Sequence, residues 1–374
     1  MVDSDAEARR YHRRQLWLSV AGFLVTAVVL LVWLASGAAA TLATALAARI
    51  PWRPAVIALV LAAVGASTAL PGFPLDVLRG YVLPRRAGLL SQSFRAWLAD
   101  RAKVAVLGGA LGLGVFELIY ALLAWSPGRW WAWSALALTA VSILLTALVP
   151  VWIVPLFYRL TPLDDPELRA RLLGLAARAG VPAAEVSVAD LSRKGRAANA
   201  AVVGLGRTRR ILVSDTLLAS FPPDEVEVVL AHELAHHARG HLAQALGVQA
   251  ILFVAMFGAA HVAIRAGVAW LGLAGLADPA GLPWVALVLA GLGLATTPLA
   301  AAWSRRLERE ADAAALEVTR APATFIAAME RLGRLNLAER RPGRLKEWLF
   351  ATHPSLDERI ARAQAVERRL AGAA

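Results

Sequence analysis

The sequence has no cysteine in 374 residues, and its 27 acidic residues are outnumbered by 39 lysines and arginines. Without cysteine there are no disulfides, and a bound metal must be held by histidines and carboxylates. The formal net charge of +12 would also suit a nucleic-acid-binding protein. The arginines, however, cluster beside uncharged apolar runs, so we interpret the charge as that of cationic loops at a bilayer and expect no nucleic-acid partner.

Hydrophobic residues make up 58% of the chain, and the mean hydropathy is +0.57. Ordinary globular proteins contain roughly 45–50%. The excess lies in long runs, and about 20 apolar residues suffice to cross a bilayer. The first run is too long for a typical cleaved signal, so we expect a retained span. The six predicted spans are residues 16–36, 54–74, 104–125, 131–157, 242–264 and 283–304.

The arginines also predict an orientation. They are dense before the first span, between the second and third, after the fourth and after the sixth, whereas the other loops hold few. Because cationic loops stay on the cytosolic side, we expect both termini and the large polar segments in the cytosol. The expectation is a multi-pass protein of a bacterial plasma membrane, in contact with the lipid bilayer.

We therefore divide the chain into four parts. Residues 1–158 form an N-terminal membrane region with four spans, and residues 242–304 form a transmembrane hairpin. Residues 159–241 read as a small α/β unit, and residues 305–374 as a helical C-terminal portion on the same side of the membrane. In the polar parts we predict helices at 167–179, 304–320, 322–338 and 355–371, a helix from Pro223, and three strands at 185–191, 199–204 and 210–214.

The helix from Pro223 carries the sequence His232-Glu233-Leu234-Ala235-His236. Histidines four residues apart project from one helix face, so both imidazoles suit a single tetrahedral zinc. Glu233, beside them, is placed to act as general base on the attacking water and then as acid toward the leaving amine. This pattern predicts metal-assisted hydrolysis of a peptide bond.

A catalytic zinc is usually held by three protein ligands, so a third one is needed beside the two histidines. The fifth and sixth spans form an antiparallel hairpin, which must bring the residues after Ser304 close to those before Leu242. Glu308 and Asp312 follow Ser304 at i,i+4 spacing and share a helix face. Either carboxylate suits the third ligand position.

Four other polar residues lie beside the motif or inside the predicted spans. His237 is rotated ~100° from His236 around the helix, so we do not expect it to be a ligand. His241 either supports the site or lies at the membrane interface, and we favour the interface. His261, in the fifth span, is expected to make a hydrogen-bonded packing contact, and Glu117, in the third, to face protein or water as a candidate chamber residue.

The stretch from Gly204 to Gly206 hints at a dinucleotide-binding loop. It leads into a predicted strand, whereas the fingerprint requires a helix. We therefore expect no nucleotide.

In combination the motifs resemble those of a known family. They are His232 to His236 with the trailing Gly240-His241, Ser304-Arg305 with Glu308, Ala311 and Asp312, Asn199-Ala200 with Arg210-Ile211 and Asp215 to Leu218, and His353-Pro354 with Arg359. The sequence is thus similar to the membrane zinc metallopeptidases that include the type I CAAX prenyl endopeptidases and the heat-shock protease HtpX. Its long N-terminal membrane region is nearer to the prenyl-protease branch.

The resemblance implies one zinc ion per chain, with Glu308 as the third ligand and Asp312 orienting a ligand imidazole. It implies that the strand with Asn199 and Ala200 binds an extended substrate peptide. It also implies catalytic positions for His353 and Arg359 near the scissile bond, with His353 donating to the developing oxyanion.

The expected fold is a mainly α polytopic membrane protein with a zincin-like α/β domain. The expected function is a zinc endopeptidase that acts on peptide or protein substrates, lipidated or membrane-associated ones included. The alternatives are a quality-control protease like HtpX, or a catalytically silent membrane scaffold or transporter subunit. The intact Glu233 argues against a silent protein.

Overall fold

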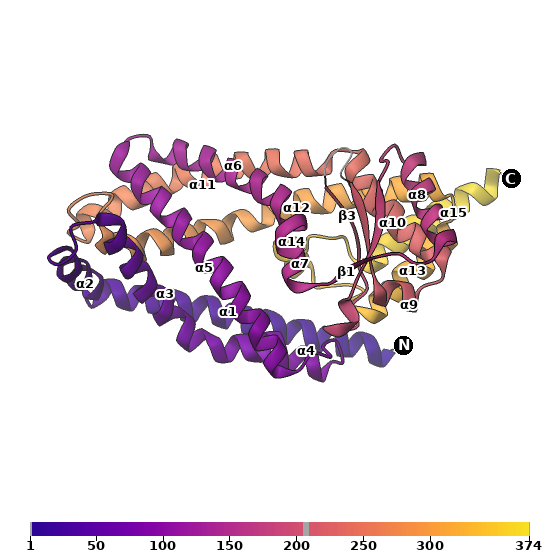
Figure 1. The fold of residues 1–374 in the computed structure, drawn as a ribbon, viewed down its shortest axis with the longest axis horizontal. Coiled ribbons are helices and arrows are strands. Elements are labelled where there is room, and N and C mark those ends of the chain that lie inside the picture. Colours follow the sequence, from indigo (N-terminus) through magenta and orange to yellow (C-terminus); the bar gives the residue numbers. More distant parts are fainter. Residues whose placement is uncertain (1, 205–208, 374) are drawn as a thin grey trace.

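A bundle of long apolar helices fills one half of the molecule, and a small α/β unit fills the other (Figure 1). The computed structural model describes residues 2–204 and 209–373. Leu205 and Gly206, in the stretch that hints at a nucleotide loop, lie outside the described residues. Both ends of the described chain lie on the side of the α/β unit.

The six predicted spans are confirmed as six helices, or runs of helix, that are long and apolar enough to cross a membrane. A shorter apolar helix, α2 (Ala38–Ala47), follows the first of them. The six are α1 (Val2–Ala35); α3 (Arg53–Val77) with η1 (Leu78–Val82) and α4 (Leu83–Arg86); α5 (Phe94–Trp125); α6 (Trp130–Leu148) with η2 (Val149–Ile153) and α7 (Val154–Phe157); α11 (His241–Trp270); and α12 (Leu282–Thr319) after the short η5 (Pro279–Gly281).

Prolines shape two of these helices. The prediction that the second span ends at Pro74 is wrong, because α3 continues through Pro71 and Pro74 and then passes through the π-helical turn η1. Neighbouring groups and local π turns compensate for prolines inside membrane helices. The π-helical turn η2 falls at Pro150, inside the fourth of these helices.

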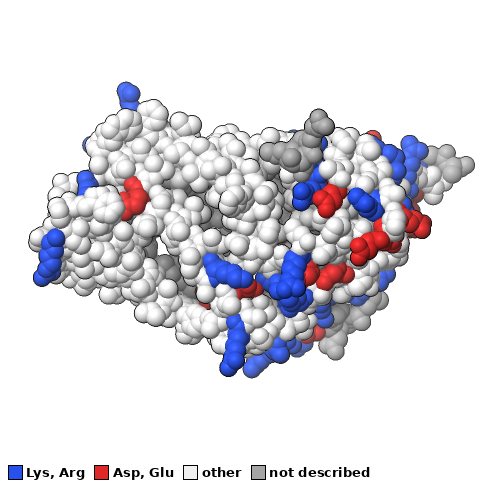
Figure 2. All heavy atoms as spheres, in the orientation of Figure 1, with Lys and Arg blue, Asp and Glu red and all other residues white. Residues whose placement is uncertain are grey.

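The membrane half has its own apolar core. Helix α11 packs against α6 and α12, and α1 packs against α3 and α12. Trp130 donates its indole N–H to Nδ1 of His261 at 3.0 Å, which confirms the packing role expected for that histidine. Glu117 is half-buried in α5, and its place in a chamber stays a prediction. Charged side chains are sparse over this half and gather on the α/β half (Figure 2).

The α/β unit contains a mixed sheet with strand order β1-β2-β4-β3. Strands β2 (Glu185–Ala189), β3 (Ala200–Val203) and β4 (Arg210–Ser214) are the three that were predicted. The fourth, β1 (Leu160–Pro162), corrects the expected count of three and pairs antiparallel with β2. Three residues ending in proline carry no alternating pattern, so β1 has no sequence signal.

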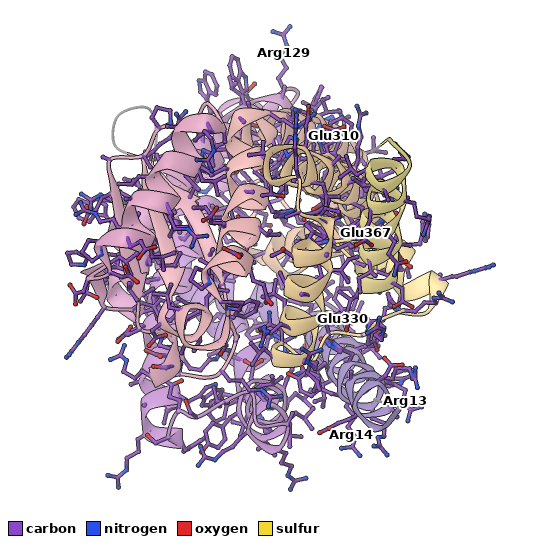
Figure 3. The ribbon with its side chains drawn as sticks, turned by 90° about the vertical axis from the view of Figure 1, so that its right-hand side faces the viewer. Arg13, Arg14, Arg129, Glu310, Glu330 and Glu367 are labelled. Carbon is purple, nitrogen blue, oxygen red and sulfur yellow. The ribbon has the colours of Figure 1, made fainter. Side chains whose placement is uncertain are left out.

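Helices surround this sheet. They are α8 (Pro166–Arg178), the one-turn η3 (Leu191–Arg193), α9 (Asp215–Ser220), α10 (Pro223–Ala238), α13 (Pro322–Leu335), α14 (Arg344–Phe350) and α15 (Leu356–Ala373). The helix predicted at 304–320 is the last part of α12 rather than a separate element, and α14 was not predicted. Buried side chains from α8, α10 and the sheet share one core with those of α13 and α15. Chain segments on either side of the α11–α12 hairpin therefore build a single unit (Figure 3).

Candidate active site

Helix α10 bears the histidine motif and places His232 in the protein interior. It begins with Pro223 in its first turn, followed by Asp224 and Glu225, where acidic groups suit the helix dipole. It ends before Gly240, whose φ of 64° is left-handed and lets the chain turn into α11. His232 is buried near the middle of α10, so the fold fixes its ring against the neighbouring α12.

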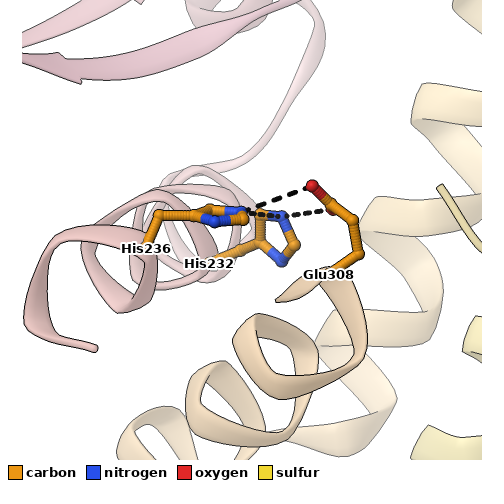
Figure 4. A group of neighbouring side chains, drawn as sticks. All are labelled: His232, His236 and Glu308. Atoms are coloured by element: carbon orange, nitrogen blue, oxygen red, sulfur yellow. Dashed lines mark hydrogen bonds and ion pairs between the residues drawn. The ribbon is translucent and has the colours of Figure 1, made fainter. Parts of the chain in front are cut away.

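His232, His236 and Glu308 converge on one point (Figure 4). Nε2 of His232 lies 3.3 Å from Nε2 of His236 and 3.2 Å from Oε2 of Glu308. Nε2 of His236 lies 3.5 Å from Oε1 of Glu308. The hairpin of α11 and α12 thus brings the carboxylate of Glu308 to the two imidazoles of α10, as expected from the sequence.

This donor set fits zinc. Tetrahedral ligands about 2.0–2.1 Å from zinc lie about 3.3 Å apart, which matches the spacings of these three side chains. Oε2 of Glu308 is also buried without a hydrogen-bond partner among the described residues. Two imidazole nitrogens lie close to it, but in a geometry that forms no hydrogen bond. An orphaned carboxylate oxygen between two imidazoles is expected of a metal ligand.

Asp312 and Arg359 stand behind His232. Oδ1 of Asp312 lies 2.9 Å from Nδ1 of His232, which directs the Nε2 atom of that ring toward Glu308. Arg359 donates to both oxygens of Asp312. Burial opposes the charged form of His232, but the carboxylates of Asp312 and Glu308 outweigh it and raise the pKa of His232 to about 9.

The pKa of His236 is shifted in the opposite direction from that of His232. Burial, together with the positive charge of His232, lowers the pKa of His236 to about 4. Its imidazole is therefore neutral at pH 7 and free to bind a metal.

Glu233 lines a cavity of about 350 Å³ beside this cluster, together with His232, His353 and Arg359. Burial raises the pKa of the Glu233 carboxyl. A raised pKa makes the ionised group a stronger base, as a proton acceptor at this position requires. Apolar side chains of α10, α13 and α15 also line the cavity, namely Val229, Met329, Leu332 and Leu356.

His353 enters the site from the loop before α15. Its ring is 60% exposed, and its Nδ1 lies 2.8 Å from Oε2 of Glu308. Asn199 and Ala200, which were expected to bind substrate, lie on the same cavity. All the residues singled out in the sequence for the site therefore lie within one small region.

The expectation that His241 lies at the interface is wrong. It is buried, and its Nδ1 lies 2.9 Å from Nδ1 of His236, so it supports that ring from behind. The left-handed Gly240 turns the chain so that His241 faces back toward α10. The Gly-His pair after the motif was the available signal. His237 is not in the cluster and instead donates to the carbonyl of Val202 at 2.8 Å.

Comparison with known families covers most of the chain. Residues 162–367, more than half of the sequence, match the family described as peptidase family M48. The chain belongs to peptidase family M48. Residues 3–159 match the region described as "CAAX prenyl protease N-terminal, five membrane helices". In that range the structure has four candidate spans and the shorter apolar helix α2.

Individual relatives agree with this membership. An uncharacterized metalloprotease, YhfN of Bacillus subtilis, is 27% identical over 310 residues, which are 80% of this chain and 71% of YhfN. The CAAX prenyl protease 1 of Saccharomyces cerevisiae is 32% identical over 176 residues, covering 47% of this chain and 39% of the yeast protein. This chain therefore spans well under half of that yeast relative.

Among solved structures, the crystal structure of S. mikatae Ste24p superimposes with a TM-score of 0.83. The match covers 96% of this chain and 89% of that one at 24% identity, and it shows a shared fold. Because it belongs to family M48 and has six candidate spans, the protein is an integral membrane metallopeptidase. The cluster of His232, His236 and Glu308 suits the zinc of that family. The predictions of fold, enzyme class and cofactor are confirmed.

Proposed function

We propose that this M48 protein cleaves lipidated proteins at the cytosolic surface of a bacterial plasma membrane, with zinc held by His232, His236 and Glu308. The convergence of these three side chains is the observation that carries the proposal. The cluster lies where α11 begins and α12 leaves its apolar stretch. A peptide bond close to a lipid anchor would reach a site at this level.

Each neighbouring side chain has a role in the proposal. When bound, the zinc would act as a Lewis acid and lower the pKa of the attacking water. Glu233 takes the proton from that water and returns it to the leaving amine. His353, exposed at the cavity, donates to the developing oxyanion, while Asp312 and Arg359 hold the ring of His232.

Two separate apolar cores divide the protein into a catalytic unit and a membrane part. We assign the catalytic unit to residues 159–241 and 305–374, because their apolar side chains share one core. Residues 1–158 and 242–304 form the membrane part, which has a second core. Asn199 and Ala200 bind the substrate backbone at the rim of the cavity.

The cytosolic orientation rests on charge. The N-terminus lies on the side of the α/β unit (Figure 1), and Arg13 lines a cavity together with Glu339 and Arg341 of the C-terminal segment. Charged side chains gather on that half (Figure 2). Since cationic segments stay in the cytosol, this end and the site face the cytosol.

The lipidated substrate is supported by the match of residues 3–159 to the N-terminal region of CAAX prenyl proteases. The test is a peptidase assay on detergent-purified protein, with peptides that end in Cys-aliphatic-aliphatic-X and carry either a farnesyl thioether or a free thiol. We expect kcat/KM to be at least about tenfold higher for the farnesylated peptide, because a few buried methylene groups supply that difference. Equal cleavage of both peptides and of unfolded membrane proteins would instead favour quality control.

Two controls separate catalysis from binding. Removing zinc with 1,10-phenanthroline should abolish cleavage, and added zinc should restore it. The Glu233→Gln variant should bind one zinc per chain and lose at least about 100-fold in kcat, because the proton acceptor is missing. Wild-type activity in this variant would exclude Glu233 as the proton acceptor, whereas the absence of zinc-dependent cleavage by the wild-type protein would favour the scaffold alternative.

A further inference from the structure

Strand β3 lies at the edge of the sheet, because it pairs only with β4 among the described strands. The backbone N–H of Ser214, in β4, donates to the carbonyl of Asn199 at 2.9 Å. In antiparallel pairs, residues alternate between those that bond to the partner and those that point away. The register Ala200↔Val213 and Val202↔Ile211 therefore directs the peptide groups of Ala200 and Val202 to the free edge.

One end of this free edge is occupied by Asn336, which follows α13. Its Oδ1 accepts from the backbone N–H of Ala198 at 3.2 Å, and its Nδ2 reaches the carbonyl of Ala198 at 3.5 Å. The carbonyl of Ala197 instead accepts from the hydroxyl of Thr216 on the β4 side. Ala198 therefore points to the free edge, and the carboxamide of Asn336 takes the place of a neighbouring strand.

The other end is occupied by His237, from α10. Its Nε2 lies 2.8 Å from the carbonyl oxygen of Val202, so the ring nitrogen donates to the free edge. Between the two capped positions lies Ala200. No side chain of the described residues bonds to its peptide groups, and it lines the cavity with His232 and Glu233.

We infer that His237 and Asn336 cap the free edge of β3 on both sides of Ala200, so that, among the residues the structure describes, Ala200 supplies the one open carbonyl acceptor of this edge for an extended substrate. This inference deepens the proposed function, on which it rests. A substrate then pairs through one residue instead of adding a full strand. The small cavity of about 350 Å³ agrees with such a short footprint. His237 and Asn336 act as positioning residues that set the register of the peptide over Glu233.

Capping also protects the protein. An uncapped edge strand is a template for pairing with any extended chain. Side-chain caps on Val202 and Ala198 leave a gap one residue wide in the strand that packs against the zinc-binding helix α10. Peptides that enter the cavity can use this gap, whereas long strands cannot.

The experiment measures binding rather than cleavage, so hydrolysis is not required for it. The probe is the tightest binder in a panel of unlipidated fluorescent decapeptides, each with an aliphatic residue at a different position, on zinc-loaded Glu233→Gln protein. Each peptide N–H of that binder is then replaced in turn by an ester oxygen, which removes one donor. With one open acceptor, we expect one position to weaken binding by about tenfold, the effect of one lost buried hydrogen bond.

Two variants in this background test the caps separately. His237→Ala frees the carbonyl of Val202, so a second sensitive position should appear two residues from the first. Asn336→Ala frees the carbonyl of Ala198 and should add a position on the other side. His237→Gln keeps a donor and should retain the single position, as should the control Gln244→Ala, which removes a side-chain bond to Arg239 outside the edge.

Sensitive positions at every second residue in the parent protein would overturn the inference, as would an unchanged pattern in both alanine variants or the absence of peptide binding. If the wild-type protein hydrolyses no peptide while peptide binding is present, the proposed function is contradicted but the inference about the caps is not.

Discussion

Arg359 donates hydrogen bonds to both oxygens of Asp312, with Nε 2.9 Å from Oδ2 and Nη2 2.6 Å from Oδ1. The same Oδ1 lies 2.9 Å from Nδ1 of His232. Asp312 is almost fully buried, so without its partners its charge would be costly. A bidentate guanidinium therefore stabilises the carboxylate that orients one zinc-binding ring.

The Arg359→Gln substitution removes both of these hydrogen bonds to Asp312. We expect zinc affinity to fall about 10–100-fold, the range found when partners behind zinc ligands are removed. Competition with a fluorescent zinc chelator measures the change. Arg362→Gln, on the same helix, removes an exposed pair with Glu358 and serves as the control. Equal zinc affinities in both variants would show that Arg359 does not position the ring.

Zinc uptake should release a proton from His232. In the metal-free protein the pKa of this residue is about 9, so its ring is charged at pH 7 and must lose a proton to bind metal. Affinity should therefore rise with pH, by about tenfold per unit below pH 9. Calorimetry in buffers of different ionisation enthalpy counts the proton. Asp312→Asn removes one cause of the raised pKa, and release at neutral pH should then be smaller.

The sequence predicts the parts of this protein that local patterns encode. Apolar runs of about 20 residues predicted the six spans. The i,i+4 histidines and the hairpin predicted that Glu308 or Asp312 lies beside the two imidazoles, and the family resemblance singled out Glu308. Strand β1 was missed because its pairing with β2 depends on residues 25 to 29 positions away, as in Leu160↔Ala189. The continuity of α12 from Leu282 to Thr319 was also missed, because a change from apolar to charged residues does not interrupt a helix.

The position of His241 was missed for a related reason. Its burial depends on the left-handed turn at Gly240, which places it against His236. We expect His241→Ala to weaken zinc binding about tenfold, because His236 loses the group that fixes its ring orientation. Stopped-flow release of zinc to a chelator measures the effect. His12→Ala is the control, since His12 contacts the carbonyl of Leu337 instead of the metal cluster. An unchanged release rate in His241→Ala would assign His241 to packing alone.

Gly195 joins the membrane half to the catalytic half. It forms a β-bridge with Leu90, and a Cβ atom at this position would lie 2.3 Å from the carbonyl oxygen of Leu89. Because that contact is with backbone, the loop must move to accept a side chain. Gly195→Ala should therefore lower the free energy of unfolding by about 1–3 kcal/mol, as overpacking does.

Thermal unfolding in detergent measures this loss as a lower Tm. Gly343→Ala is the control, because its φ is −62° and no heavy atom lies within 4 Å of the added carbon. If the loop at Gly195 aligns the two halves, its alanine variant should also lose kcat at temperatures far below its Tm, while zinc content stays at one per chain. A Tm equal to that of Gly343→Ala would mean that the loop yields freely and that the contact between Leu89 and Gly195 does not hold the halves together.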